Sequence, residues 1–579
     1  MGIGRTPPDR VSALQRGTSL GPAAPGGATI PAWFLRSSFA ERALGAAQSI
    51  CVVSAVMAAS FGCSGSGETA PLPPALMHER TASTAFGVAQ SRWQHVPVPS
   101  ADGPELAAVV LAAPVMDAPG KNPTPIGYLR LGERVARSAE PVTTEGCPGG
   151  WYAVRPVGFV CQDDRVTQRM DHPLVRAFPD GPERSRPLPY RYAFVRSVVP
   201  NYLKVPSQEE QERYEMHLER HLRSYAKLKR SWDQFTPGAN QLPLSSSGAV
   251  SGTLAGDATA PNMNERYGGH GDDTTPWWLV GERRVPNVST FQAPPYAVIA
   301  GRVKRHAGVA LVDSFVAGPE ALGRRFAVSV DGRLIPADKL KPEAGSLFHG
   351  AELAGKSLPV AFSFREGTRL WDFASGGAPA RGEQLPHRTL LELTGKVKNF
   401  RGERYVETRD GHWARSGDLK TAAAPSAVPW FAKRGVRWVD ISILNQTLTL
   451  YEGSQPIYVT LVSTGRDGLG EPGKTLSTPT GTFRIYQKHV TTTMDSSVAD
   501  SEFELRDVPW VMYFQGGYAL HGAYWHDDFG RPRSHGCINL SPVDARYVFS
   551  WVTPDVPEDW HGASAGDTMG PGTLLNIHP

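Results

Sequence analysis

The chain of 579 residues contains few cysteines, five in all, and no dense block of Lys and Arg residues. Its formal charge of +4 is spread along the sequence, so the basic footprint of a nucleic-acid-binding protein is missing and no nucleic-acid partner is expected. Beyond one segment near the start, no apolar run is long enough to cross a bilayer. These absences exclude nucleic-acid-binding proteins and membrane proteins with many spans.

Glycine and proline are abundant instead, with 60 and 50 residues, which is about 19% of the chain. This share lies below the low-complexity range and predicts a globular chain with many loops and short strands. The length exceeds what one hydrophobic core organises, so three or more domains are expected. We predict a mainly β, multidomain fold with a β-rich C-terminal domain, small β-barrel modules before it and one long helix.

Residues 1–62 are expected to be a signal segment. Arg36 and Arg42 precede an uncharged stretch rich in Ala, Val and Ser, which ends at Gly62. A basic start, an apolar run and a small residue at the end are typical of a secretory signal. This order predicts that the protein is exported.

Cys63 follows directly and resembles the lipid-bearing cysteine of a bacterial lipoprotein, which implies a membrane anchor through a lipid on Cys63. A plain cleaved signal peptide is the alternative. We expect a periplasmic location, with a Pro/Ala/Ser-rich tether over residues 63–104 that holds the rest of the chain away from the membrane.

Cys147 and Cys161 form an even pair once the other three cysteines are assigned to the signal, the lipid site and the C-terminal motif described below. In an oxidising compartment such a pair predicts a disulfide, which closes a loop of about 15 residues. Two unpaired thiols are the alternative.

The first module is expected over residues 105–165, where short strands alternate with Pro and Gly clusters. The run from Gly150 to Val154, followed by Gly158 to Val160, resembles a bacterial SH3-like barrel. Residues 166–290 are expected to be a linker region that contains the long helix, from Ser207 to Arg230.

Ser207 and Glu210 fit a capping box at the start of that helix. One or two further small β modules, SH3-like in the second case, are expected over residues 291–425. A faint repeat lies within them, because residues 326–332 and 405–411 both end in Asp-Gly and are 79 positions apart. Asp-Gly between β-rich runs predicts a hairpin turn, and generic hairpin chemistry is the alternative origin of the repeat.

The strongest chemical signal lies near the C-terminus. Cys537 is the fourth residue of a Ser-His-Gly-Cys-Ile-Asn run, and a His-Gly pair begins at His521, 16 positions upstream. Nucleophilic cysteine chemistry needs a thiolate, an imidazole to take its proton and backbone N–H groups aimed at an oxyanion. Cys537 is the candidate nucleophile and His521 the candidate base. His535 is an alternative base, because alternate residues of an extended segment share a face.

Core packing and metal binding are the alternative roles for these residues. A lone cysteine or histidine is more often a packed core residue than a catalytic one. His521, His526, His535 and Cys537 are residue types that bind zinc, but the spacing typical of zinc sites is absent, so no metal and no cofactor are expected.

The motif resembles the L,D-transpeptidase (YkuD-type) family over residues 437–579. The resemblance rests on His521-Gly522, on the run from Ser534 to Asn539, and on an upstream Ser-Thr-Pro-Thr-Gly-Thr-Phe segment, residues 477–483. Asn539 departs from the Arg that many members carry. The resemblance implies that the Gly522 carbonyl orients His521 and that the N–H groups of Gly536 and Cys537 hold the oxyanion.

The resemblance further implies that Ser534, His535 and Asn539 shape a substrate cleft, while Tyr513, Trp525 and His526 are candidates for its wall. The implied reaction is peptidoglycan crosslinking through a cysteine thioester, with peptidoglycan stem peptides as partners. A hydrolase or amidase of the same fold, which uses water as acceptor, is the first alternative. A non-catalytic wall-binding lipoprotein is the second, and the intact Cys537/His521 pair disfavours it.

Overall fold

The computed structural model describes residues 93, 95–233, 263–281, 283–286, 288, 293–373, 377–432, 435–496 and 503–579. All of them fall in one compact unit, Val56–Pro579. The predicted signal segment, Cys63 and most of the tether lie outside the described residues. The fold is mainly β, as predicted. Within the described ranges, no helix is both long and apolar enough to cross a membrane.

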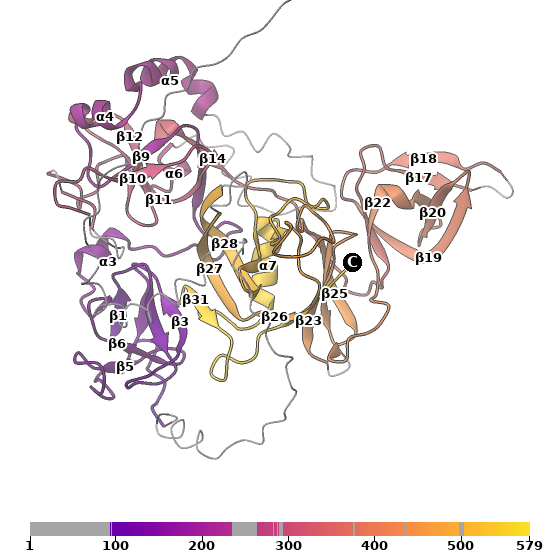
Figure 1. Cartoon of the computed structure of the whole chain (residues 1–579), viewed down its shortest axis with the longest axis horizontal. Coiled ribbons are helices and arrows are strands. Elements are labelled where there is room, and N and C mark those ends of the chain that lie inside the picture. The colour runs from indigo at the N-terminus through magenta and orange to yellow at the C-terminus, as the bar shows by residue number, and fades with distance from the viewer. Residues whose placement is uncertain are drawn as a thin grey trace, which may run out of the picture. The chain divides into compact units, whose positions relative to one another are not determined.

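In the part of the chain that the structure describes, three successive groups of seven strands precede the C-terminal domain. We name them module 1, module 2 and module 3 (Figure 1). Module 1 comprises β1 (Glu105–Ala108), β2 (Ala113–Met116), β3 (Pro125–Leu129), β4 (Arg134–Ala136), β5 (Trp151–Ala153), β6 (Phe159–Cys161) and β7 (Val166–Thr167). Module 2 comprises β8 (Arg191–Val195), β9 (Val199–Tyr202), β10 (Ile299–Val303), β11 (Gly308–Val316), β12 (Arg325–Ser329), β13 (Leu334–Pro336) and β14 (Leu340–Glu343). Module 3 comprises β16 (Val360–Ser363), β17 (Arg369–Asp372), β18 (Ala380–Gln384), β19 (Leu390–Phe400), β20 (Glu403–Thr408), β21 (Trp413–Arg415) and β22 (Leu419–Ala422).

The three modules share one pattern of strand pairing. In each, the first strand pairs with the fourth and seventh, and the second pairs with the third and sixth. The fourth, fifth and sixth strands pair in succession; in module 1 the fourth and fifth are joined by the single bridge Arg137–Val154. The chain therefore carries three copies of one topology. These pairings place the seventh strand at one end of the order and the third strand at the other. Among the described residues these two end strands do not pair with each other, so a closed SH3-like barrel stays a prediction.

The repeat of 79 residues corresponds to equivalent hairpins of modules 2 and 3. Strands β12 and β13 enclose the first Asp-Gly pair, and β20 and β21 enclose the second. In both turns a hydroxyl two residues before the aspartate binds its carboxylate: Ser329 binds Asp331, and Thr408 binds Asp410. The repeated sequence therefore reflects both the topology that modules 2 and 3 share and the side-chain hydrogen bond common to the two turns.

The segment expected as a linker, residues 166–290, holds more than helices. It begins with β7 of module 1 and the short helix α3 (Pro173–Ala177), and it contains β8 and β9, which belong to module 2. In the described residues between β9 and β10 lie the helices α4 (Gln208–Tyr214), α5 (Leu218–Asp233) and α6 (Met263–Arg266).

The single helix predicted from Ser207 to Arg230 is wrong, since α4 and α5 are separate. Glu215 ends α4 in an extended conformation, and His217 has a φ of 55°. The cause is a buried ionic cluster, because Glu215 pairs with Arg324 at 2.8 Å and with Lys339 at 2.6 Å. The capping box is confirmed by both of its hydrogen bonds.

A disulfide joins Cys147 to Cys161 in module 1, the pair expected from the cysteine count. Cys147 is fully buried in a small aromatic cluster that includes Trp151 and Phe159. The bond therefore ties the long β4–β5 connection to β6.

The C-terminal domain is built from two sheets around one apolar core. The first sheet contains β15 (Ala351–Glu352), β23 (Arg437–Ser442), β24 (Thr447–Glu452), β25 (Gln455–Leu461), β26 (Gly481–Arg484) and β32 (Leu574–His578). The second contains β27 (Gln487–Ser496), β28 (Phe503–Gln515), β29 (Tyr518–Gly522), β30 (Ile538–Leu540) and β31 (Gly562–Ser564). Helix α7 (Pro542–Trp551) packs on β28 and β29 (Figure 1).

Helix α7 begins with a side-chain cap and a proline in its first turn. The Ser541 side chain accepts the N–H of Asp544, and Pro542 occupies the first turn. Ala545, Val548 and Phe549 are buried in the core that both sheets share. Because β30 ends at Leu540, the helix follows the Cys537 segment almost directly and fixes its direction.

Candidate active site

The strand pair β29–β30 brings the predicted base and nucleophile together. The strands are parallel, and His521 lies opposite Asn539. Cys537 lies two residues before Asn539, so the period of two places its side chain on the same sheet face as His521. Both residues line one cavity of about 280 Å³, and both are nearly fully buried.

His521 is held in a neutral state. Its Nδ1 lies 3.4 Å from the Gly522 carbonyl oxygen, to which an N–H at this position donates. Burial lowers the pKa of His521 to about 4, against the raising effect of that hydrogen bond. A neutral imidazole with Nδ1 protonated leaves Nε2 as the proton acceptor, which is what a general base requires.

The turn before Cys537 is shaped by Gly536. This residue has a φ of 119°, and a Cβ here would lie 2.5 Å from a ring carbon of Tyr518. Ser534 closes the turn, since its hydroxyl donates to the Cys537 carbonyl and accepts the Gly536 N–H at 3.0 Å. The Gly536 N–H is therefore engaged by Ser534 in this structure, and its role as an oxyanion donor stays a prediction.

Thr478, from the upstream Ser-Thr-Pro-Thr-Gly segment, anchors the same turn. Its hydroxyl donates to the Gly536 carbonyl at 2.8 Å and accepts the Gly465 N–H at 2.9 Å. The side chain is buried. The upstream motif therefore has a physical role, because Thr478 fixes the position of the loop that carries Cys537.

Asn539 and His526 form a buried pair. Asn539 Nδ2 lies 2.9 Å from His526 Nε2, and Asn539 Oδ1 has no partner in the described part of the chain. Burial lowers the pKa of His526 to about 3, and its Nδ1 accepts the Asp528 N–H at 3.2 Å. The neutral ring then carries its proton on Nε2, which needs an acceptor. Exchanging the two ends of the amide provides that acceptor.

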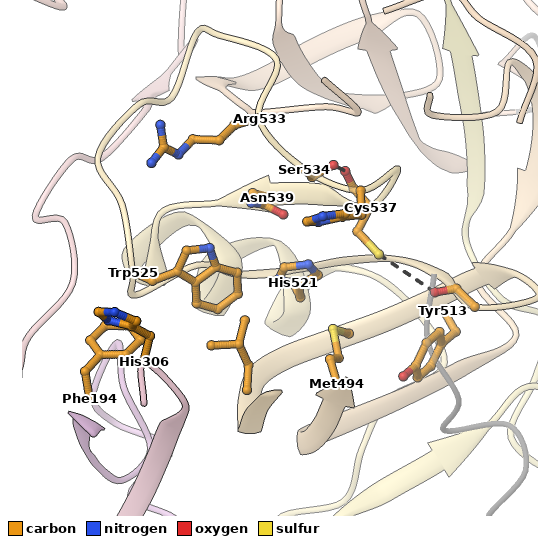
Figure 2. A pocket seen from close by; sticks show the side chains of 13 residues that line it. Phe194, His306, Met494, Tyr513, His521, Trp525, Arg533, Ser534, Cys537 and Asn539 are labelled. Carbon is orange, nitrogen blue, oxygen red and sulfur yellow. Dashed lines mark hydrogen bonds between the residues drawn. The ribbon is translucent and has the colours of Figure 1, made fainter. Parts of the chain in front are cut away.

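The other predicted substrate-binding residues line the same cavity. Ser534, His535, Tyr513 and Trp525 all contribute to its surface. Figure 2 labels Ser534, Tyr513 and Trp525 among them. The Trp525 ring lies 5.6 Å from the His521 ring, so it forms a wall beside the base. His535 is half-buried, and burial lowers the pKa of its imidazole.

The thiol of Cys537 contacts the Gly517 carbonyl oxygen at 3.8 Å, the dashed line in Figure 2. As for the zinc alternative, no group of three or more His, Cys, Asp or Glu side chains with metal-binding geometry occurs within the described ranges. The side chains gathered here support acyl transfer on sulfur, with His521 as the proton acceptor.

Two features of the site could not be predicted from the sequence. Thr478 belongs to the upstream motif, but its contact with Gly536 depends on the fold. Phe194 and His306 of module 2 also line the cavity, and no sequence signal connects them to Cys537.

Comparison with known proteins finds similarity in the C-terminal part of the chain. The family model of the L,D-transpeptidase catalytic domain matches residues 436–573. A putative L,D-transpeptidase, YciB, of Bacillus subtilis is 26% identical over 147 residues, which cover 21% of this chain and 61% of that protein.

Two solved structures are also similar. The catalytic domain of an E. faecium L,D-transpeptidase is 21% identical, with a TM-score of 0.19, and the match covers 24% of this chain and 96% of that one. An L,D-transpeptidase from Xylanimonas cellulosilytica is 20% identical, with a TM-score of 0.17, covering 27% of this chain and 64% of that one. Modules 1 to 3 lie outside the family match, and residues 436–573 are similar to the L,D-transpeptidase catalytic domain.

Proposed function

We propose that this protein is a peptidoglycan L,D-transpeptidase that forms crosslinks between stem peptides through a thioester on Cys537. The observation that carries the proposal is the shared face of β29 and β30, which presents Cys537 and a neutral His521 to one cavity. The family match of residues 436–573 supports the substrate class.

In the first half-reaction, His521 takes the thiol proton and the Cys537 sulfur attacks a carbonyl carbon of the donor stem. A C–S bond forms, the peptide C–N bond breaks, and the departing amine leaves with the proton from His521. Asn539 lines the same cavity, so we expect its amide to contact the donor peptide, while backbone N–H groups of the Cys537 loop hold the developing oxyanion. Removing one donor to a developing oxyanion typically costs about 100- to 1,000-fold in rate.

In the second half-reaction, an amine of a neighbouring stem attacks the thioester carbon. Its proton passes to His521, a new C–N bond forms, and the C–S bond breaks to return the thiolate, which recovers its proton from the imidazolium. Water can exploit the same thioester, so the choice of acceptor decides between crosslinking and hydrolysis.

The substrate lies outside the cytoplasm, which agrees with the signal-like start of the sequence. We propose that the protein is exported to the periplasm, is anchored there by a lipid on Cys63, and extends its modules from the membrane. We also propose that the modules are SH3-like, because all three repeat one seven-strand pairing.

The test is incubation of the full chain with a synthetic tetrapeptide stem and separation of the products by mass spectrometry. A dimer that has lost one terminal D-residue is the expected product. A truncated monomer alone would assign the chain to the hydrolase alternative, and an unchanged stem would contradict both activities.

A further inference from the structure

The far wall of the active-site cavity belongs to module 2. Phe194 on β8 and His306, on the turn between β10 and β11, line the same cavity as Cys537 and His521. Figure 2 shows both side chains on the side of Trp525 away from Cys537. A cavity bounded by the catalytic domain on one side and by module 2 on the other needs both to be complete.

A close backbone contact holds module 2 in this place. Gly308, the first residue of β11, pairs in parallel with Leu505 of β28. A Cβ on Gly308 would lie 2.0 Å from the Tyr524 hydroxyl, so the approach requires glycine. The Tyr192 hydroxyl adds a buried hydrogen bond to the Asp507 carbonyl at 2.6 Å.

The two wall residues are themselves fixed by the backbone of module 2. His306 has a φ of 68°, and its N–H donates to the Val195 carbonyl at 2.7 Å. Phe194 directly precedes Val195 on β8, and its ring lies 5.7 Å from that of Tyr524. Their placement on adjoining backbone segments makes the wall a preformed surface.

The position of the base shows which reactant meets this wall. The attacking amine must lose its proton to His521, so it approaches on the His521 side of the thioester. From His521 a row of rings leads to module 2: Trp525 at 5.6 Å, then Tyr524 at 5.1 Å from Trp525, then Phe194. The acceptor side of the cavity therefore ends at Phe194 and His306.

We propose that module 2 forms the acceptor wall of the transpeptidase, and that Phe194 and His306 select a primary amine carried on an aliphatic chain. The methylene groups pack against Phe194 and Trp525, and the His306 imidazole at the exposed rim hydrogen-bonds the peptide beyond the chain. Holding the amine in line raises its effective concentration over water. This inference rests on the proposed function.

The test separates the two half-reactions in the full chain. Acylation is followed by intact mass with a carbapenem. Acceptor choice is followed as the ratio of aminolysis to hydrolysis, with a tetrapeptide donor and Nα-acetyl-lysine amide as the amine. Phe194→Ala and His306→Gly, which keeps the left-handed backbone, are expected to lower that ratio by at least about 10-fold while acylation changes by less than about 3-fold.

Val198→Ala and Arg305→Ala are the matched controls, because both residues are exposed in module 2 and neither lines the cavity. Phe194→Leu provides a milder variant if Phe194→Ala lowers the melting temperature. An unchanged ratio in the wall variants, or an equal loss of acylation, overturns the acceptor wall. Wild-type protein that acylates but never transfers to the amine overturns the proposed transpeptidase itself, and the wall with it.

Discussion

His521 lies directly opposite Asn539 across the parallel strands β29 and β30, and this register places the imidazole on the face of the sheet that Cys537 shares. The base therefore comes from a strand separate from the nucleophile's loop. Its ring is oriented by the Gly522 carbonyl, whereas His535 is tied to Cys537 through the single residue Gly536. The geometry favours His521 as the proton acceptor.

His521→Ala is expected to slow acylation of Cys537 by about 100- to 10,000-fold, the usual cost of losing a general base. His535→Ala is expected to slow it less, since this side chain lines the cavity but lies on the nucleophile's own turn. Acylation rates of both variants, measured by stopped flow or mass spectrometry, show which histidine is the general base. A larger loss in the His535 variant would exchange the two roles.

The pH dependence of acylation follows from the burial of His521. Because burial lowers its pKa to about 4, the imidazole stays neutral and able to accept a proton as the pH falls through the ordinary histidine value of 6.5. The acidic limb of the acylation rate is therefore expected near pH 4, measured with free enzyme and limiting carbapenem. A limb centred on pH 6.5 would show that the working base is a solvated histidine.

Thr478→Val is expected to weaken the nucleophile loop. The change removes hydrogen bonds to the Gly536 carbonyl and from the Gly465 N–H, and leaving such buried groups unpaired costs about 1–3 kcal/mol of stability. The rate of Cys537 acylation should fall by at least about 10-fold, because the thiol is no longer held in a fixed position. Thr480→Val is the control, since Thr480 is exposed in the same segment. Equal rates in the two variants would show that Thr478 does not position the thiol.

Cys63→Ser tests the proposed anchor. If a lipid is attached at Cys63, the variant is expected to move from the membrane fraction to the soluble fraction of the cell. The N-terminal peptide of the wild type should carry the lipid mass. An unchanged fractionation without that mass would favour a plain signal peptide.

The catalytic residues could be proposed from the sequence because their signals are local. A Ser-His-Gly-Cys run specifies a turn with its nucleophile, and a His-Gly pair on an adjacent β-rich segment supplies the base. The roles of Ser534 and Gly536 within this turn were less predictable. The Gly536 N–H binds the Ser534 hydroxyl, a contact that depends on the turn's backbone geometry rather than on spacing.

The longer-range features could not be predicted, because each depends on residues far apart in the chain. The predicted long helix breaks at Glu215, whose partners Arg324 and Lys339 lie more than 100 positions later. The shared topology of the modules was visible only as one repeated hairpin. In module 2 the segment from Leu203 to Val298 separates β9 from β10 and hides the correspondence.

The acceptor wall is unpredictable for the same reason. Phe194 and His306 reach the cavity only because Gly308 allows β11 to pair with β28. A glycine at that position has no distinctive sequence context, so its importance follows from the structure alone.

The most direct test of the central claim is the intact mass of the full chain after incubation with a carbapenem, followed by peptide mapping. We expect one covalent adduct, located on Cys537, and none on the Cys537→Ala variant, whose fold is retained. An adduct that persists in Cys537→Ala, or a wild type that never acylates, would contradict the assignment of Cys537 as the nucleophile.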